Sequence, residues 1–262
     1  MNEVVCWPVL HGRRVVAAAA LACIVACGGG GGSNGNADSS ANAKVTKDNM
    51  SAAKGTDSAT AADSVAGSIR TPVVLFLGTS LTAGLGLDPE QAYPTLIEEK
   101  AHAEGVPIRV VNAGLSGETT AGAVRRIDWV LRSPVDLVVI ESGANDALRG
   151  LGPDDARANL EQLIAAVRAK QPSANIALVQ MEAPPNFGVA YTKAFHAIYP
   201  EVAKKENVTL LPFLLDGVAG IPRLNQPDGV HPNLTGERIV ADNVWKALKP
   251  VVVKLDRGLK GG

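Results

Sequence analysis

Residues 73–81 read VVLFLGTSL, and this stretch decides the fold. The run 73–77 is apolar, opens with two β-branched valines and ends at Gly78, a pattern typical of a buried strand. Thr79 and Ser80 follow at once. Polar residues directly after a buried parallel strand lie where open α/β sheets bind their ligands, so this stretch predicts both a sheet and the edge that carries its site.

The same alternation of strand and helix continues toward the C-terminus. Further strands are expected at 108–111, 135–140, 176–179 and 208–211, and helices at 89–103, 119–131, 153–170, 189–205 and 234–248. Only 4% of the residues are aromatic, so Val, Leu, Ile and Ala must fill most of the core. The pattern predicts an α/β fold, a three-layer α/β/α sandwich around a flavodoxin-like, five-stranded parallel sheet.

Charge and cysteine content argue against several classes of function. The 25 Lys and Arg residues nearly balance the 26 Asp and Glu residues, which gives no electrostatic reason to expect a nucleic-acid partner. The three cysteines, Cys6, Cys23 and Cys27, all precede residue 28, so the rest of the chain has no disulfide framework and no Cys-based metal site. No Walker loop or Gly-x-Gly-x-x-Gly turn opens a helix after a strand. We expect no metal, no cofactor and a monomer.

The N-terminal residues are typical of an export signal. Arg13 and Arg14 precede an apolar run, 15–26, whose twelve residues are too few to span a membrane and right for a secretory signal core. Its end, Ile-Val-Ala-Cys, resembles the lipobox of bacterial lipoproteins. Residues 1–27 are therefore predicted to be a lipoprotein signal peptide with Cys27 as the lipidated residue; an ordinary cleavable signal is the alternative.

The segment 28–70 opens with a glycine run and continues rich in Ser, Asn, Ala, Asp and Lys, which predicts a flexible low-complexity linker. Gly28 stands where an Asp would resemble an inner-membrane retention signal. These features predict an exported lipoprotein of the bacterial cell envelope, anchored to the outer membrane through its lipid, with the globular part, 71–262, in the periplasm.

Four polar blocks lie at the ends of predicted strands or before the last helix: 78–84 (GTSLTAG), 112–119 (NAGLSGET), 141–146 (ESGAND) and 227–232 (PDGVHP). In this order they resemble the SGNH, or GDSL-type, hydrolase superfamily, which is named for a catalytic Ser, an oxyanion-hole Gly and Asn, and a catalytic His. Thr79 departs from the family's usual Gly-Asp-Ser-Leu, but that Asp is not the triad acid of the family. The resemblance covers 72–253 and implies a hydrolase domain at 71–262.

Three further runs point to one branch of the superfamily. Residues 110–119 (VVNAGLSGET), 194–200 (AFHAIYP) and 210–213 (LLPF) resemble the periplasmic thioesterase, lysophospholipase and arylesterase branch. The resemblance implies a carboxylic ester hydrolase with a small-molecule ester or lipid substrate.

The residues also support a catalytic triad on chemical grounds. A serine hydroxyl needs a neighbouring base, and histidine suits neutral pH. His231 lies in a Pro/Gly/Asp loop, and Asp228, three residues before it, can hold its Nδ1–H and leave Nε2 to face Ser80. His102 and His196 fall in predicted helices and are expected to be solvated or packed. The alternative for Ser80 is a helix N-cap, and for Asp228 a local turn former.

Acyl transfer also needs hydrogen-bond donors aimed at the developing oxyanion. The expected donors are the N–H groups of Ser80 and Gly117 and the side-chain amide of Asn145, for which an Asx-turn role is the alternative. Ser116 and Ser142, the rival serines, are better explained as turn formers beside glycine.

Specificity is expected to come from the loops after the fourth and fifth strands. Ala183, Pro184 and Phe187, with Ile221 opposite, are predicted to bind substrate, because their apolar side chains suit an acyl chain or aromatic acid better than a sugar. Phe187 could instead belong to the core.

Together these features predict a serine hydrolase that cleaves carboxylic esters, as arylesterase, acyl thioesterase or lysophospholipase, through an acyl-enzyme on Ser80. One alternative keeps the fold and changes the substrate, giving a carbohydrate O-acetylesterase or acetyltransferase of the cell envelope. The other is a non-catalytic envelope lipoprotein.

Overall fold

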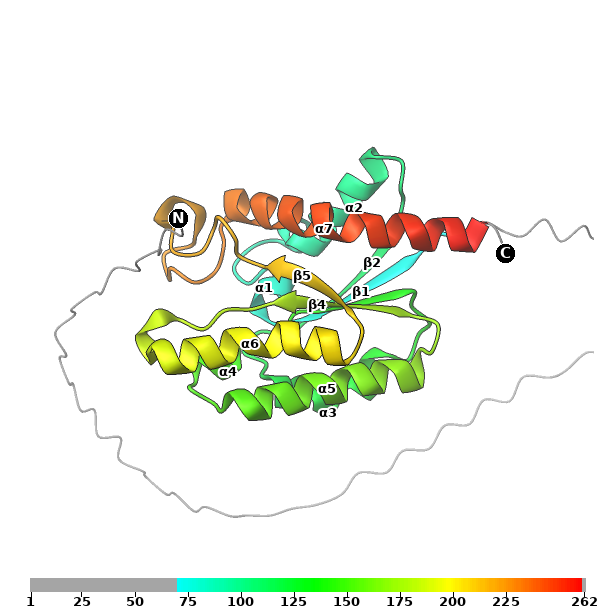
Figure 1. Ribbon diagram of the computed structural model, residues 1–262. Coiled ribbons are helices and arrows are strands. Elements are labelled where there is room, and N and C mark those ends of the chain that lie inside the picture. The colour runs from blue at the N-terminus through cyan, green and yellow to red at the C-terminus, as the bar shows by residue number, and fades with distance from the viewer. Residues whose placement is uncertain (1–69, 261–262) are drawn as a thin grey trace, which may run out of the picture. The chain divides into compact units, whose positions relative to one another are not determined.

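The computed structural model describes residues 70–260, which form one sheet between two layers of helices (Figure 1). The strands are β1 (Val73–Gly78), β2 (Arg109–Gly114), β3 (Leu137–Ile140), β4 (Asn175–Gln180) and β5 (Thr209–Phe213). They pair in parallel throughout, in the order β2-β1-β3-β4-β5. This is the flavodoxin-like order, so the predicted α/β sheet is confirmed.

Five long helices cover the two faces of the sheet. In Figure 1, α2 (Tyr93–Ala103) and α7 (Leu234–Lys260) lie on one face, and α3 (Thr120–Val130), α5 (Pro153–Lys170) and α6 (Val189–Lys205) lie on the other. Short elements follow several strands: α1 (Ser80–Ala83), α4 (Ala144–Leu148) and the 3-10 turns η1 (Pro89–Gln91), η2 (Pro185–Phe187) and η3 (Pro222–Leu224).

Strand β1 lies at the topological switch point, paired with β2 on one side and β3 on the other. All six of its residues are buried, as a central strand covered on both faces requires. It ends at Gly78, where an added Cβ would lie 1.9 Å from Thr82 Oγ1 and 2.7 Å from Glu141 Oε2. Only glycine therefore lets the chain turn directly from β1 into α1.

Two helices differ from their predicted spans by more than one residue at an end. The segment expected as one helix from residue 89 begins with η1, and Ala92, with extended backbone angles, separates it from α2. Helix α7 continues past Leu248 and through Pro250. Proline removes one helical hydrogen bond, but Val252 beyond it is fully buried in the core, so packing holds the extra turns in place.

The predicted signal peptide, its lipidation site Cys27 and nearly all of the predicted linker lie outside the described residues. Arg70, the last residue of that linker, is already bound to the domain, because its guanidinium donates to both carboxylate oxygens of Asp136 at 2.6 Å. Among residues 70–260, no helix combines the length and apolar character that crossing a bilayer would take.

Candidate active site

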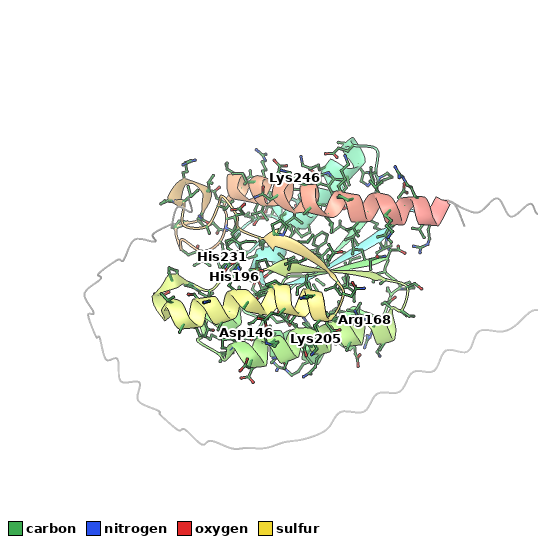
Figure 2. The ribbon with its side chains drawn as sticks, viewed as in Figure 1. Asp146, Arg168, His196, Lys205, His231 and Lys246 are labelled. Carbon is green, nitrogen blue, oxygen red and sulfur yellow. The ribbon has the colours of Figure 1, made fainter. Side chains whose placement is uncertain are left out.

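The four polar blocks meet at the carboxyl edge of the sheet. Ser80 is the first residue of α1, Gly117 lies between β2 and α3, and Asn145 lies in α4. The loop before α7 brings Asp228 and His231 to the same edge, where Figure 2 labels His231. Residues from four separate parts of the sequence are thereby gathered at the β1/β3 switch point, where open sheets of this order bind ligands.

Ser80, His231 and Asp228 form a continuous chain of hydrogen bonds. Ser80 Oγ lies 2.8 Å from His231 Nε2, and His231 Nδ1 lies 2.7 Å from Asp228 Oδ2. The other Asp228 oxygen accepts from the backbone N–H groups of Val230 at 2.9 Å and His231 at 3.0 Å. A single tight turn therefore both shapes the loop and orients the imidazole.

The charge on Asp228 decides the direction of these bonds. Burial raises the pKa of the Asp228 carboxyl, but hydrogen bonds from Val230 and from the ring and backbone of His231 outweigh it and lower the pKa to about 2. An ionised carboxylate can only accept, so the proton of a neutral His231 sits on Nδ1 and Nε2 accepts from the Ser80 hydroxyl. This arrangement can remove a proton from Ser80 Oγ.

Glu141, directly after β3, anchors the turn that carries Ser80. Its side chain is fully buried and accepts hydrogen bonds from the Thr79 N–H at 2.8 Å, Thr79 Oγ1 at 3.0 Å and Thr82 Oγ1 at 2.9 Å. Burial raises the pKa of Glu141 to about 7, although these hydrogen bonds act to lower it. Thr79, which stands where the resembled family usually has Asp, therefore stabilises the turn by donating hydrogen bonds to a buried carboxyl group.

Of the two other predicted oxyanion residues, Gly117 lies on the loop between β2 and α3 and Asn145 lies in α4, and hydrogen bonds join that loop to α4 and its C-cap. Asn145 Nδ2 donates to the Glu118 carbonyl at 2.9 Å, and Arg149 Nη2 donates to the Gly117 carbonyl at 2.7 Å. Gly117 has a positive φ of 76°, which favours glycine. Within residues 70–260, the N–H groups of Ser80 and Gly117 donate to no other group, so both are available to a bound oxyanion.

An apolar cleft of about 340 Å³ lies beside this site. It is lined by Leu81, Ala144, Leu148, Met181, Glu182, Ala183, Pro184, Pro185, Phe213, Leu215, Asp216, Gly217, Ala219 and Val230. Leu81 and Val230 are the sequence neighbours of Ser80 and His231, so the cleft adjoins the turn that carries the hydroxyl and the loop that carries the imidazole.

Two of the four predicted substrate-binding residues, Ala183 and Pro184, line this cleft. Phe187 and Ile221 do not. The Phe187 ring lies 5.4 Å from that of Tyr191, and Ile221 packs against the core. The lining residues from the β5 loop, such as Leu215 and Ala219, had no motif to mark them; an apolar loop after a strand was the only available signal.

Within residues 70–260, the two other histidines and the two rival serines lie apart from the hydrogen bonds that join Ser80, His231 and Asp228. His102 on α2 contacts the Ile108 carbonyl at 3.1 Å, and His196 on α6 binds Glu182 at 2.6 Å. Ser116 is exposed, whereas Ser142 is buried with no hydrogen-bond partner for its Oγ among the described residues.

The part of the chain that the structure describes contains no group of three or more His, Cys, Asp or Glu side chains placed to hold a metal ion.

Comparison with known proteins identifies the family. The model of the GDSL-like lipase/acylhydrolase family matches residues 76–239, which include all five residues of the predicted triad and oxyanion hole. The chain is 40% identical to the esterase TesA of Pseudomonas aeruginosa over 180 residues, 68% of this chain and 89% of that protein. The crystal structure of TesA matches with a TM-score of 0.65, over 68% of this chain and 99% of that one.

Two other relatives carry more specific names. An arylesterase of Vibrio mimicus is 36% identical over 67% of this chain and 87% of its own length. The thioesterase 1/protease 1/lysophospholipase L1 of Escherichia coli K12 is 37% identical over 68% of this chain and 84% of its own length. These matches confirm the resemblance, and the chain belongs to the GDSL-like lipase/acylhydrolase family, the ester-hydrolysing SGNH enzymes.

Proposed function

We propose that the protein hydrolyses carboxylic esters and thioesters through an acyl-enzyme on Ser80, with His231 as general base and Asp228 as the residue that orients it. One observation carries the proposal: an unbroken chain of hydrogen bonds runs from Ser80 Oγ to the ionised Asp228, and it adjoins an apolar cleft. Family membership supports the reaction class, and this geometry supports the assignment of its residues.

In the first half of the reaction, Ser80 Oγ attacks the carbonyl carbon of the ester while its proton passes to His231 Nε2. The carbonyl oxygen becomes an oxyanion that the N–H groups of Ser80 and Gly117 and the Asn145 amide stabilise. The tetrahedral intermediate then collapses: the bond to the alcohol or thiol breaks, and His231 returns the proton to that leaving group.

Water completes the cycle. His231 takes a proton from a water molecule, whose oxygen attacks the acyl carbon and forms a second tetrahedral intermediate. Its collapse breaks the bond to Ser80 Oγ, which regains a proton from His231, and a free carboxylic acid leaves. Asp228, with its pKa of about 2, stays ionised and stabilises the imidazolium in both halves.

The cleft favours a substrate with an apolar acyl group. Its walls are mostly apolar, with Met181, Pro184 and Leu215 among them. Moving an acyl chain from water into the cleft would therefore be favourable, because apolar surface is buried without the loss of hydrogen bonds from the chain to water. The names of the relatives suggest aryl esters, acyl thioesters and lysophospholipids as substrate classes, and we propose the same range here. We also propose that the enzyme acts as a monomer, because Ser80, His231 and Asp228 of a single chain already form the proposed triad.

We further propose that the enzyme is tethered at the outer membrane, facing the periplasm, by a lipid on Cys27 and the spacer 28–70. Support comes from the apolar run before Cys27 and the composition of the spacer. Full-length protein expressed in a Gram-negative host should incorporate a palmitate analogue and remain with the membrane fraction. Cys27→Ser should abolish both; labelling that persists in this variant would contradict the lipid site.

The catalytic proposal is tested with Ser80→Ala on a series of p-nitrophenyl esters from acetate to octanoate. Loss of the hydroxyl should lower kcat by at least about 10³-fold with the fold intact, and should abolish labelling by a fluorophosphonate probe. Ser142→Ala is the matched control, because it removes a buried hydroxyl that has no partner in residues 70–260 and should leave turnover unchanged. Wild-type turnover by Ser80→Ala would reject the proposal. A rate confined to acetate would favour an O-acetylesterase instead.

A further inference from the structure

The wall of the cleft carries two acidic side chains and no basic one. Glu182 follows β4 and Asp216 follows β5, and both are among the fourteen residues that line the cleft, none of which is Lys, Arg or His. The two neighbouring strands thus place a pair of carboxyl groups on the wall of a cleft that is otherwise apolar or uncharged.

Glu182 is held in place. Its Oε1 accepts hydrogen bonds from His196 Nδ1 at 2.6 Å and from Gln180 Nε2 at 3.3 Å. Its side chain is 32% exposed, and its Oε2 accepts from no group among the described residues. The bond to His196 ties the carboxylate to α6, so the charge stays at the cleft wall rather than moving with a free side chain. Among residues 70–260, the ion-pair partner of Glu182 is His196, which is charged only when protonated.

A fixed negative charge beside an apolar cleft should discriminate between acyl groups by their charge. An acyl chain that ends in a carboxylate would lose water and meet a like charge, whereas a cationic end would meet an opposite one. The aliphatic walls reduce the local dielectric constant, which strengthens both effects relative to open solvent.

We infer that Glu182 is a specificity-determining residue that selects neutral or positively charged acyl groups and rejects acyl groups ending in a carboxylate, with Asp216 acting in the same direction. This inference rests on the proposed function, because it assumes that the acyl group occupies the cleft next to Ser80.

The test compares three p-nitrophenyl esters of one chain length: octanoate, its ω-trimethylammonio analogue and the monoester of octanedioic acid. Wild type should show a kcat/KM for the cationic ester well above that for the anionic ester. Glu182→Gln should reduce this ratio by about three- to tenfold, the range of a partly exposed charge pair, and added salt should reduce it in wild type. All three esters are assayed at the same pH and ionic strength.

Glu99→Gln is the matched control. It makes the same change in net charge on α2, outside the cleft lining, and should leave both the ratio and the octanoate rate unchanged. Asp216→Asn should lower the ratio in the same sense as Glu182→Gln. Wild type could have the same kcat/KM for the cationic and anionic esters, or Glu182→Gln could leave the ratio of the two values unchanged. Either result would overturn this inference and leave the proposed function standing. Failure of wild type to hydrolyse octanoate would overturn the proposed function beneath it.

Discussion

Ser80 Oγ and His231 Nε2 lie 2.8 Å apart although 151 positions separate the two residues in sequence. Gln226 holds their two segments together. Its backbone N–H donates to the His231 carbonyl at 2.7 Å, and its side-chain amide donates to the Leu85 carbonyl, just after α1, at 2.7 Å. The nucleophile turn and the histidine loop are thus linked by the Gln226 side chain as well as by the hydrogen bond between Ser80 and His231.

Asp228→Asn tests the orientation of the imidazole. The amide oxygen of Asn can still accept from the Val230 N–H, so the loop should keep its shape, but the amide does not stabilise an imidazolium as a carboxylate does. We expect kcat to fall by about 10²- to 10⁴-fold on p-nitrophenyl hexanoate, with the thermal midpoint little changed. A variant with near-normal kcat would show that the carboxylate is dispensable.

Asn145→Ala tests the oxyanion hole. Removing one donor typically lowers kcat by about 10²- to 10³-fold, while KM should change little because the donor acts on charge that develops in the transition state. The variant also loses the hydrogen bond to the Glu118 carbonyl, for which we expect a cost of about 1 kcal/mol in unfolding free energy. Steady-state kinetics and urea denaturation separate the two effects. A rise in KM with kcat intact would point to a role in substrate binding instead.

Glu141 is predicted to be a positioning residue for Ser80. In Glu141→Ala, the Thr79 N–H and two threonine hydroxyls lose their buried acceptor, which should cost about 3 kcal/mol of stability. A displaced Ser80 should also lower kcat by about tenfold or more at unchanged KM. Glu141→Gln retains one acceptor oxygen and should recover most of kcat. Equal kcat in both variants and wild type would leave Glu141 with a purely structural role.

The sheet could be predicted because its central strands, such as β1 and β3, are buried on both faces and so consist of apolar runs. The positions of Ser80, Gly117 and Asn145 followed from the same reasoning, since parallel strands bring their carboxyl ends to one edge. Both predictions depend on local patterns that are visible within a few residues.

The contacts that tune the site depend on pairs of residues far apart in sequence. Nothing local marks Glu141 as the acceptor for Thr79, or Gln226 as the link to Leu85. Phe187, by contrast, makes a contact that a local sequence pattern could have predicted. It begins an aromatic series at intervals of four residues, Phe187, Tyr191, Phe195 and Tyr199, whose neighbouring rings are 5.4–6.2 Å apart. That helical spacing was visible in the sequence and places the ring against α6 rather than in the cleft.

The last prediction concerns the dependence of stability on pH. Glu237 at the start of α7 is 2% exposed and accepts from the Tyr93 N–H at 2.8 Å. Burial raises the pKa of Glu237 from its ordinary 4.5 to about 8; the hydrogen bond from Tyr93 opposes this rise, and the nearby Glu141 adds to it. Between these two values the folded state binds more protons than the unfolded state, so the free energy of unfolding should fall as pH rises from about 4.5 to about 8.

Glu237→Gln removes this titration and keeps an acceptor for the Tyr93 N–H. The variant should match wild type near pH 5 and exceed it near pH 9, by an amount on the order of a few kcal/mol. Urea denaturation across this pH range measures the difference directly. Glu141, whose pKa is raised to about 7, makes the free energy of unfolding fall with pH in the same way, and it is still present in the variant. The free energy of unfolding of the variant should therefore fall less steeply with pH than that of wild type, but it should still fall. If the free energy of unfolding depended on pH equally in the two proteins, Glu237 would already be ionised in the folded state at neutral pH.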